Sequence, residues 1–431
     1  MRIRIIAPTL ARKKAKRLEG AAFQLPPLAL PVLAGLTPDH HEIKIIDENI
    51  DNIDFNSGAD LVAITSMTST APRAYEIADR FRSRGAKVVM GGIHASALPE
   101  EALQHADSVV IGEAEGVWPR LITDFERKAL KRIYKNEHFP DLTNLPPPRY
   151  DLLNTKKYTT TAITHVSRGC PNACNFCTVT KFFGRRYRMR PIEDVVSEVR
   201  NFKSRFIGFF DDNIAGNPGY AERLFDALRR EKVMWASQAS IGIVKNRPLL
   251  KKAARSGCKG LFVGFESIHE EGIDEVHKPV NKKKDFFEAV KILNDHGIVV
   301  MGSFILGLDT DPPDIFERTL EFTMKSNIDL VQFCILTPFP GTPLFARLQK
   351  ENRILHYDWA KYDIGNPVFR PRNIDPDLLK EKVDWMWREF YSGKKILTRI
   401  FKLGRRLPFF GIPMIFLNYA FKRMVSLTQE L

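Results

Sequence analysis

The sequence lacks the cysteine content of a disulfide-bonded protein. Only five cysteines occur among 431 residues, and three of them lie between positions 170 and 177. An odd number of cysteines, clustered in this way, indicates a reducing compartment rather than a secreted disulfide framework. The chain opens from Met1 directly into a strand pattern, so we expect no targeting segment and a cytoplasmic location.

The C-terminal region lacks acidic residues and an apolar run long enough to cross a bilayer. From Lys394 to Arg423 there are eight basic residues and no acidic one. The apolar stretch over residues 407–421 contains two prolines and an asparagine, and it is too short to span a membrane. Two interpretations stay open: peripheral contact with the inner face of an anionic membrane, or helices that cover the open side of a barrel.

The charge balance is basic, with 65 Lys and Arg against 51 Asp and Glu. A net charge of +14 suggests an anionic partner without choosing among nucleic acid, membrane and phosphorylated substrate. In the tail the basic residues alternate with aliphatic ones and lack interleaved stacking aromatics, so we expect no nucleic-acid binding. A second basic run, residues 12–17, follows the first strand and is either a solvated loop or an anion contact.

The most specific feature present is the segment Cys170-Pro-Asn-Ala-Cys174-Asn-Phe-Cys177. Three thiolates cannot all pair as disulfides, but they can hold a soft metal centre, most often an iron–sulfur cluster. A four-iron cluster held by three cysteines keeps one iron free for another ligand. Structural zinc is the alternative, but it usually needs four protein ligands and a second Cys-x2-Cys pair, which the sequence does not contain.

This spacing, with the aromatic Phe176 before the last cysteine, resembles the signature of the radical S-adenosylmethionine (SAM) superfamily. The resemblance implies a [4Fe-4S] cluster on Cys170, Cys174 and Cys177, with SAM chelated at the open iron. It also implies reductive cleavage of SAM to a 5′-deoxyadenosyl radical. The electron would come from an external donor such as flavodoxin or ferredoxin.

Residues 1–136 alternate between short apolar runs and helical patterns, which is typical of a Rossmann-like, doubly wound parallel sheet. We expect strands over residues 3–7, 42–47, 61–65, 87–90 and 108–111, and helices over 28–36, 71–84 and 100–104. Ligands on such sheets bind beyond the carboxyl ends of the strands. The polar and glycine residues at these ends are Ser66, Thr68, Thr70, Gly91, Gly92, His94, Gly112 and Glu113.

From the pattern alone these residues are either ligand contacts or ordinary turn residues. A sheet of this kind before a radical SAM triplet resembles the cobalamin (B12)-binding radical SAM subfamily, which implies that they contact cobalamin. The Asp-x-His-x-x-Gly motif of many cobalamin proteins is missing, because Asp39-His40-His41 has the wrong spacing. We therefore expect no protein histidine on the lower face of the cobalt. A degenerate domain that binds no cobalamin is the alternative.

A proline-rich linker over residues 137–159 separates this region from a second α/β region over 160–345. Six expected strands, over 161–167, 206–210, 234–239, 260–264, 298–306 and 330–336, suit a partial (β/α)6 barrel with its chemistry at the strand ends. The resemblance implies SAM contacts at Phe176, Asp211 or Asp212, Ser237, Glu266 and Ile305. Asp212 could instead cap a helix. We expect residues 346–431 to form an aromatic and basic, mainly helical C-terminal region. Cys258 and Cys334 suit core packing, and a place near the substrate stays open for Cys334.

Together these features predict a cobalamin-dependent radical SAM enzyme that methylates an unactivated carbon of an apolar small molecule, lipid-like or tetrapyrrole-like. One alternative is a cyclase or carbon–carbon bond-forming enzyme of the same architecture. The other is a corrinoid or iron–sulfur protein without catalytic activity.

Overall fold

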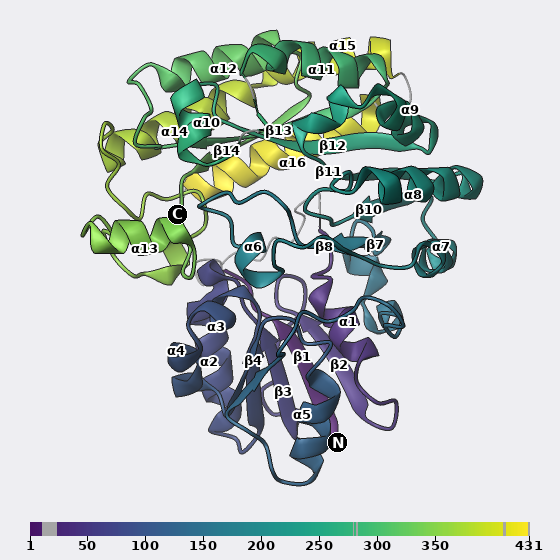
Figure 1. Cartoon of the computed structure of the whole chain (residues 1–431). Helices are drawn as coiled ribbons and strands as arrows, with labels where there is room; N and C mark the ends of the chain where they lie inside the picture. Colours follow the sequence, from purple (N-terminus) through teal and green to yellow (C-terminus); the bar gives the residue numbers. More distant parts are fainter. Residues whose placement is uncertain (11–23, 279, 282, 408–410, 430–431) are drawn as a thin grey trace.

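The computed structural model describes residues 1–10, 24–278, 280–281, 283–407 and 411–429. It contains two six-stranded parallel sheets, one below and one above the short helix α6 (Val179–Phe182) in Figure 1. The predicted fold class, a Rossmann-like sheet followed by a partial barrel and a helical C-terminal region, is confirmed. The basic run over residues 12–17 lies outside the described residues.

The first sheet has the strand order β2-β1-β3-β4-β5-β6. Helices α2 (Ala71–Arg82), α3 (Ile93–Ala97) and α4 (Pro99–His105) cover one face, and α1 (Ala29–Gly35) and α5 (Trp118–Glu126) cover the other (Figure 1). Alternate strand residues enter the two cores, as the pleat requires. The five expected strands are confirmed; the sixth strand and α5 were not predicted. The strands are β1 (Arg2–Ala7), β2 (Glu42–Asp47), β3 (Leu61–Thr65), β4 (Lys87–Gly91), β5 (Ser108–Ile111) and β6 (Ile133–Lys135).

The second sheet has the order β14-β13-β12-β11-β10-β7, so it curves as a barrel that stays open between β7 and β14. Every neighbouring pair is parallel. All six expected strands are confirmed, with ends that differ by a few residues. They are β7 (Ile163–Thr164), β10 (Phe206–Phe209), β11 (Met234–Gln238), β12 (Cys258–Glu266), β13 (Val299–Leu306) and β14 (Leu330–Ile335).

The helices of the barrel lie on its outer side, where their apolar faces close the core (Figure 1). They are α7 (Ile192–Asn201), α8 (Pro218–Glu231), α9 (Arg247–Arg255), α10 (Glu270–Glu275), α11 (Phe286–Asp295) and α12 (Ile315–Lys325). Between β7 and β10 the chain forms a small antiparallel pair, β8 (Ser167–Arg168) and β9 (Arg188–Met189), which brackets the cysteine segment and α6. Helix α13 (Pro343–Lys350) follows β14.

The C-terminal region forms three helices, α14 (Pro376–Phe390), α15 (Gly393–Arg406) and α16 (Gly411–Gln429). Asp375 caps α14 by accepting the backbone N–H groups of Asp377 and Leu378. Ile396 and Leu403 of α15 are buried in the core of the barrel. The tail therefore covers one side of the barrel. Among the described residues, no helix has both the length and the hydrophobicity needed to cross a membrane.

Candidate active site

The carboxyl ends of both sheets border the same region of the molecule. A cavity of about 330 Å³ is lined by Thr65, Gly91 and Gly112 from the first sheet and by Phe210 and Asp212 from the second. A second cavity, of about 280 Å³, lies on the barrel side and contains all three clustered cysteines. Asp212 lines both cavities. The fold thus brings the two groups of predicted site residues to two cavities that share a wall at Asp212.

The cysteine segment is an irregular loop that the surrounding chain holds in place. Gly169 has φ +88°, and a Cβ there would lie 2.4 Å from the carbonyl oxygen of Arg186, so only glycine fits. The Asn175 side chain donates a hydrogen bond to the backbone carbonyl of Glu275 at 2.7 Å. The backbone carbonyl of Asn175 accepts a hydrogen bond from Leu344 N at 3.1 Å. Contacts from α10 and α13 therefore fix a loop that has no regular secondary structure.

The three thiols suit a metal cluster rather than a single ion. Burial raises the pKa of Cys174 to about 11 and that of Cys177 to about 12, so without a cation they keep their protons. Among the described residues, the one trio of His, Cys, Asp and Glu ligand atoms within 4.8 Å of one another lies elsewhere, at His40, His41 and Glu126. The thiols are spread more widely than four-coordinate zinc requires. Their number, spread and shared cavity fit a [4Fe-4S] cluster.

A buried ion pair, Glu266 with Lys278, stands in the thiol cavity. The two charged atoms are 2.5 Å apart, and Lys278 also donates to the carbonyl of Gly264 at 2.9 Å. Glu266 has φ +63°, an unusual conformation for this residue, and a Cβ on Gly264 would lie 2.3 Å from its carboxylate. Glu266 was predicted as a site residue. Lys278 was missed, because a single lysine in a loop carries no sequence signal.

The two aspartates after β10 have different environments. Asp211 is fully buried and accepts hydrogen bonds from Val166 N, Ser167 N and the Ser167 hydroxyl. It therefore supports the start of the cysteine segment and does not line the thiol cavity. Burial, and then the charge of Asp211, raise the pKa of Asp212 to about 7. Of the two residues left open by the sequence, Asp212 is the one that reaches both cavities.

The remaining predicted SAM contacts divide in the same way. Phe176 and Ile305 line the thiol cavity, but Ser237 does not, because its hydroxyl donates to the carbonyl of Phe209 at 2.8 Å. Its neighbour Gln238 lines the cavity instead. Neighbouring residues on a strand face opposite sides of the sheet, and the sequence alone did not show whether Ser237 or Gln238 of β11 faces the cavity. Cys258 packs in the barrel core, whereas Cys334 lines the thiol cavity.

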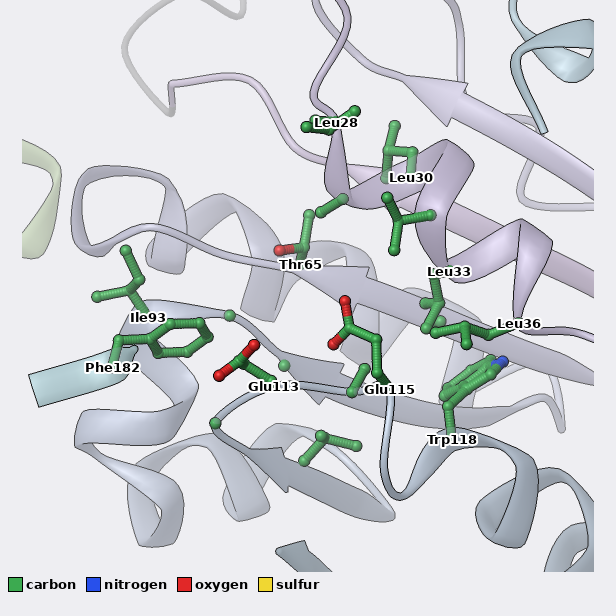
Figure 2. Close-up of a pocket in the computed structure, with 18 of the residues that line it drawn as sticks. Leu28, Leu30, Leu33, Leu36, Thr65, Ile93, Glu113, Glu115, Trp118 and Phe182 are labelled. Atoms are coloured by element: carbon green, nitrogen blue, oxygen red, sulfur yellow. The ribbon is translucent and has the colours of Figure 1, made fainter. Parts of the chain in front are cut away.

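The cavity between the sheets is mainly apolar. Figure 2 shows four leucines at positions 28, 30, 33 and 36 on one side and Trp118 nearby. Gly92 has φ +94°, and a Cβ there would lie 2.7 Å from Ser66 O, so this strand end must be glycine. Among the predicted cobalamin contacts, the cavity is lined by Ser66, Gly91, Gly92, Gly112 and Glu113. An apolar cavity whose edge is formed by the backbone of Gly91, Gly92 and Gly112 fits a flat, bulky cofactor such as a corrinoid.

Three predicted cobalamin contacts point elsewhere. Thr68 and Thr70 lie in a short 3-10 turn and do not line the cavity, and the Thr70 hydroxyl bonds to the backbone of Met67. His94 is fully buried, with Nε2 3.1 Å from the Tyr75 hydroxyl and 3.3 Å from a Glu101 carboxylate oxygen. Trp359, from the segment after the barrel, donates to the same carboxylate at 2.9 Å. His94 therefore belongs to a contact between the first sheet and the C-terminal region.

Glu113 and Glu115 form an ion cluster with Arg168 and Arg188, from the two strands that bracket the cysteine segment. Arg168 contacts both carboxylates, each at 2.5 Å, and Arg188 contacts Glu113 at 2.5 Å. All four side chains are largely buried. Burial opposes ionisation of Glu115, but the charge of Arg168 prevails and lowers the pKa of this carboxyl. The Gly-Glu-x-Glu sequence thus ties the first sheet to the residues just before Cys170, a role that its position after a strand did not reveal.

His165, which was not predicted, lines the cavity between the sheets from the barrel side. Burial, and then the charge of Arg168, keep its pKa well below the usual range, so the imidazole is neutral. In the part of the chain that the structure describes, its Nε2 has no hydrogen-bond partner. A buried nitrogen without a partner is costly, and a bound group in the cavity would satisfy it.

Comparison with known proteins agrees with this geometry. Residues 164–323 match the model of the radical SAM superfamily, and residues 18–122 match that of the B12 binding domain. The chain is 35% identical over 387 residues to bacteriochlorophyllide d C-12(1)-methyltransferase of Chlorobaculum tepidum, covering 87% of this chain and 84% of the relative. It is 30% identical over 399 residues to hopanoid C-2 methylase of Rhodopseudomonas palustris, covering 88% and 73%. The structure of the cobalamin-dependent SAM radical enzyme OxsB, with aqua-cobalamin and SAM bound, superposes with a TM-score of 0.70 at 15% identity, over 91% of this chain and 67% of that chain.

Proposed function

Since the chain belongs to the cobalamin-binding radical SAM methyltransferases, we propose that it methylates an unactivated carbon of an apolar small molecule, such as a lipid or a tetrapyrrole. The observation that carries this proposal is the shared wall at Asp212, where the thiol cavity meets the cavity between the sheets. A substrate at this junction would contact both cofactors at once. The proposed division of labour is residues 1–136 for cobalamin, 137–159 as linker, 160–345 for the cluster and SAM, and 346–431 as cover.

When bound, the [4Fe-4S] cluster supplies the electron that cleaves SAM to a 5′-deoxyadenosyl radical, and methylcobalamin supplies the methyl group. Cys170, Cys174 and Cys177 would hold three of the four irons. Asp212, as a carboxylate, would accept a hydrogen bond from the methionyl ammonium of SAM. The Lys278 ammonium offers a counter-charge for the SAM carboxylate, and Ile305 offers an apolar surface for adenine.

The residues of the other cavity would orient the corrinoid and exclude water. Gly91, Gly92 and Gly112 present bare backbone at the strand ends, and the leucines of α1 cover the apolar part. His165 would form a hydrogen bond with the corrinoid edge from the barrel side. Excluding water matters here because a substrate carbon radical must react with the methyl donor before it takes part in side reactions.

A wide crevice beside this cavity offers a path for the substrate. Its volume is about 1270 Å³, and it meets the cavity at Ile93, Gly112, Glu113 and Phe182. Phe139 and Pro140 provide an apolar wall, and Lys135 and Lys181 stand on its exposed rim. This combination suits a large apolar molecule that carries an acidic group. The substrates in the names of the two relatives, a chlorophyllide and a hopanoid, are large and mainly apolar.

Labelled SAM tests the function directly. Protein reconstituted without oxygen, given cobalamin, a flavodoxin or ferredoxin as electron donor, and candidate substrates, should form 5′-deoxyadenosine and transfer the labelled methyl carbon to product. Deoxyadenosine without label transfer would replace the methylase by a cyclase or another radical reaction. Neither product, in protein whose cluster is intact, would favour a binding protein without catalytic activity.

We also propose that the C-terminal helices touch the inner face of a membrane while the chain remains cytoplasmic. Leu397 and Phe401 lie one turn apart on α15 and are 64% and 65% exposed, and Phe416 on α16 is 64% exposed. Lysines and arginines flank these side chains, which suits an interfacial helix on anionic lipid. The full chain should sediment with phosphatidylserine vesicles, and Leu397→Ser/Phe401→Ser should not. Equal sedimentation of both proteins would remove this part of the proposal.

A further inference from the structure

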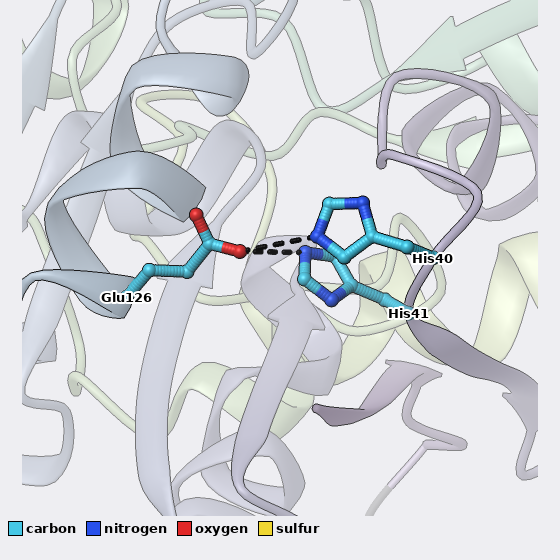
Figure 3. A group of neighbouring side chains, drawn as sticks. All are labelled: His40, His41 and Glu126. Carbon is cyan, nitrogen blue, oxygen red and sulfur yellow. Dashed lines mark hydrogen bonds and ion pairs between the residues drawn. The ribbon is translucent and has the colours of Figure 1, made fainter.

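Two adjacent histidines contact a glutamate from a distant part of the chain. Their spacing does not match the cobalamin motif. His40 and His41 lie in the connection between α1 and β2, and Glu126 is the last residue of α5. Figure 3 shows both imidazole rings directed at the same carboxylate oxygen. The site lies at the amino end of the first sheet, the end opposite to the glycines and cavities described above.

The distances between the ligand atoms fit one metal ion. Nε2 of His40 is 3.2 Å and Nε2 of His41 is 3.3 Å from the same oxygen of Glu126. All three ligand atoms lie within 4.8 Å of one another. Two ligands at about 2.0–2.2 Å from a tetrahedral zinc ion lie about 3.3–3.5 Å apart. The three side chains therefore already hold nearly the spacing that coordination needs.

His41 supplies a second, independent observation. Its side chain is only 1% exposed, and in the described part of the chain neither of its ring nitrogens forms a hydrogen bond. A buried imidazole whose nitrogens form no hydrogen bond carries a desolvation cost that the nearby Glu126 carboxylate offsets only in part. A metal ion on Nε2 would remove that cost for this atom, and His40 and Glu126 leave a path to solvent through which an ion can enter.

The connection that carries the two histidines is held by contacts from the residues just before them. The Trp118 indole N–H donates to the Thr37 hydroxyl at 2.9 Å, and Arg149 pairs with Asp39 at 3.2 Å. His41 N donates to the carbonyl of Pro38 at 3.2 Å. The ligands are thus positioned before any ion arrives, which reduces the entropy that binding must overcome.

We propose that His40, His41 and Glu126 form a binding site for a divalent metal ion of the zinc class, with solvent in the remaining coordination position. Two imidazoles and one carboxylate suit zinc, whereas magnesium and calcium prefer oxygen ligands throughout. The ion joins the chain before β2 to the end of α5. Because α1 and α5 both line the cavity between the sheets, the site braces that cavity from its far end.

The test uses the full chain with its [4Fe-4S] cluster reconstituted, so that the three clustered thiols are occupied. Zinc is titrated against a chromophoric chelator, and we expect one further zinc per chain. Glu126→Gln and His40→Asn should each weaken this binding at least tenfold. His105→Asn is the matched control, because His105 pairs with one carboxylate, Asp79, at 2.8 Å and should leave the affinity unchanged.

Cobalt in place of zinc identifies the ligands. Binding at the proposed site should give a visible spectrum of nitrogen and oxygen ligands that is lost in Glu126→Gln and kept in His105→Asn. Circular dichroism in the presence of a chelator shows that each variant is folded. The proposal is overturned if the wild type binds no further zinc, if both site variants bind it as tightly as the wild type, or if the cobalt spectrum shows thiolate ligands.

Discussion

The two cavities share a wall but hold their ligands in different ways. The thiol cavity has apolar walls, but it also contains groups that carry or accept charge: three cysteines, Asp212 and the Glu266–Lys278 pair. The cavity between the sheets is lined mainly by leucines, glycines and a tryptophan, and two of its three carboxylates, Glu113 and Glu115, are paired with arginines. We expect the first cavity to bind its cofactors by ligation and charge, and the second to bind mainly by shape. Substitutions should therefore affect the two sides separately.

The largest expected effect comes from a cysteine of the triplet. Cys174→Ala should abolish the iron–sulfur absorbance and the formation of 5′-deoxyadenosine, because three thiolates are the minimum that holds the cluster. Cobalamin uptake should persist, since Cys174 does not line the cavity between the sheets. Cys258→Ala, in the barrel core, is the control and should keep both cofactors. Loss of cobalamin together with the cluster would show that the two sides are not separable.

The next effect concerns charge in the thiol cavity. Lys278→Gln removes the ammonium proposed to meet the SAM carboxylate, and it also leaves Glu266 buried without its partner. A hydrogen bond to a charged group contributes about 1.5–3 kcal/mol, so SAM affinity should fall about tenfold to a hundredfold. Equilibrium dialysis of cluster-loaded protein measures this. Lys291→Gln removes an exposed pair with Asp295 and should change nothing. An unchanged SAM affinity in Lys278→Gln would limit the pair to a structural role.

Shape is tested at Gly92. An alanine there must keep a positive φ and would collide with Ser66, so Gly92→Ala should weaken cobalamin binding about tenfold while the cluster forms normally. Gly85 is the matched control, because it also has a positive φ but has open space around its α-carbon. Gly85→Ala should carry the same backbone strain and leave cobalamin binding intact. Equal losses in both variants would point to strain rather than to the cavity.

The smallest effect is a gain of stability at the shared wall. Asp212 has a pKa of about 7 in the folded protein, raised from 3.8, so the folded state holds this proton more tightly than the unfolded chain does. Stability is therefore lost as pH rises from about 4 to about 7, and the deficit is constant above that range. Asp212→Asn should raise the unfolding free energy of cofactor-free protein by about 1–3 kcal/mol at pH 8, with a gain that shrinks toward pH 4.

Thermal melts at several pH values measure this change, and SAM binding should weaken in the same variant. Asp211→Asn is a poor substitute, because Asp211 accepts several hydrogen bonds and its loss should destabilise the fold. A gain in Asp212→Asn that does not depend on pH would show that the carboxylate is not the source of the cost.

The sequence predicted the features that depend on local chemistry. The cysteine spacing predicted a cluster site at three residues that the structure brings to one cavity, and the periodicity of apolar residues placed eleven strands close to where the structure has them. It did not predict which side chains at a strand end turn into a cavity. Ser237 and Gln238 differ by one position, and Thr68 and Thr70 are drawn into a 3-10 turn. Register and local turns depend on packing that no short pattern encodes.

Contacts between distant parts of the chain also could not be predicted from the sequence. Lys278 reaches Glu266 from a loop, and His94 reaches Trp359 through Glu101 across the boundary of two regions. Glu113 stood where a ligand contact was expected, yet its carboxylate is taken by arginines from the barrel. The types and positions of these residues are common in proteins and form no motif that predicts a partner. Only the three-dimensional arrangement shows their partners.

The ion cluster of Glu113, Glu115, Arg168 and Arg188 has a consequence for how the active protein is assembled. Arg168 is two residues from Cys170, so the contacts that hold the sheets together also set the start of the cysteine loop. Any movement that parts the two sheets at this ion cluster would therefore also move the start of the cysteine loop. We therefore expect the order in which cobalamin and the cluster are supplied to affect how much of the protein acquires both cofactors.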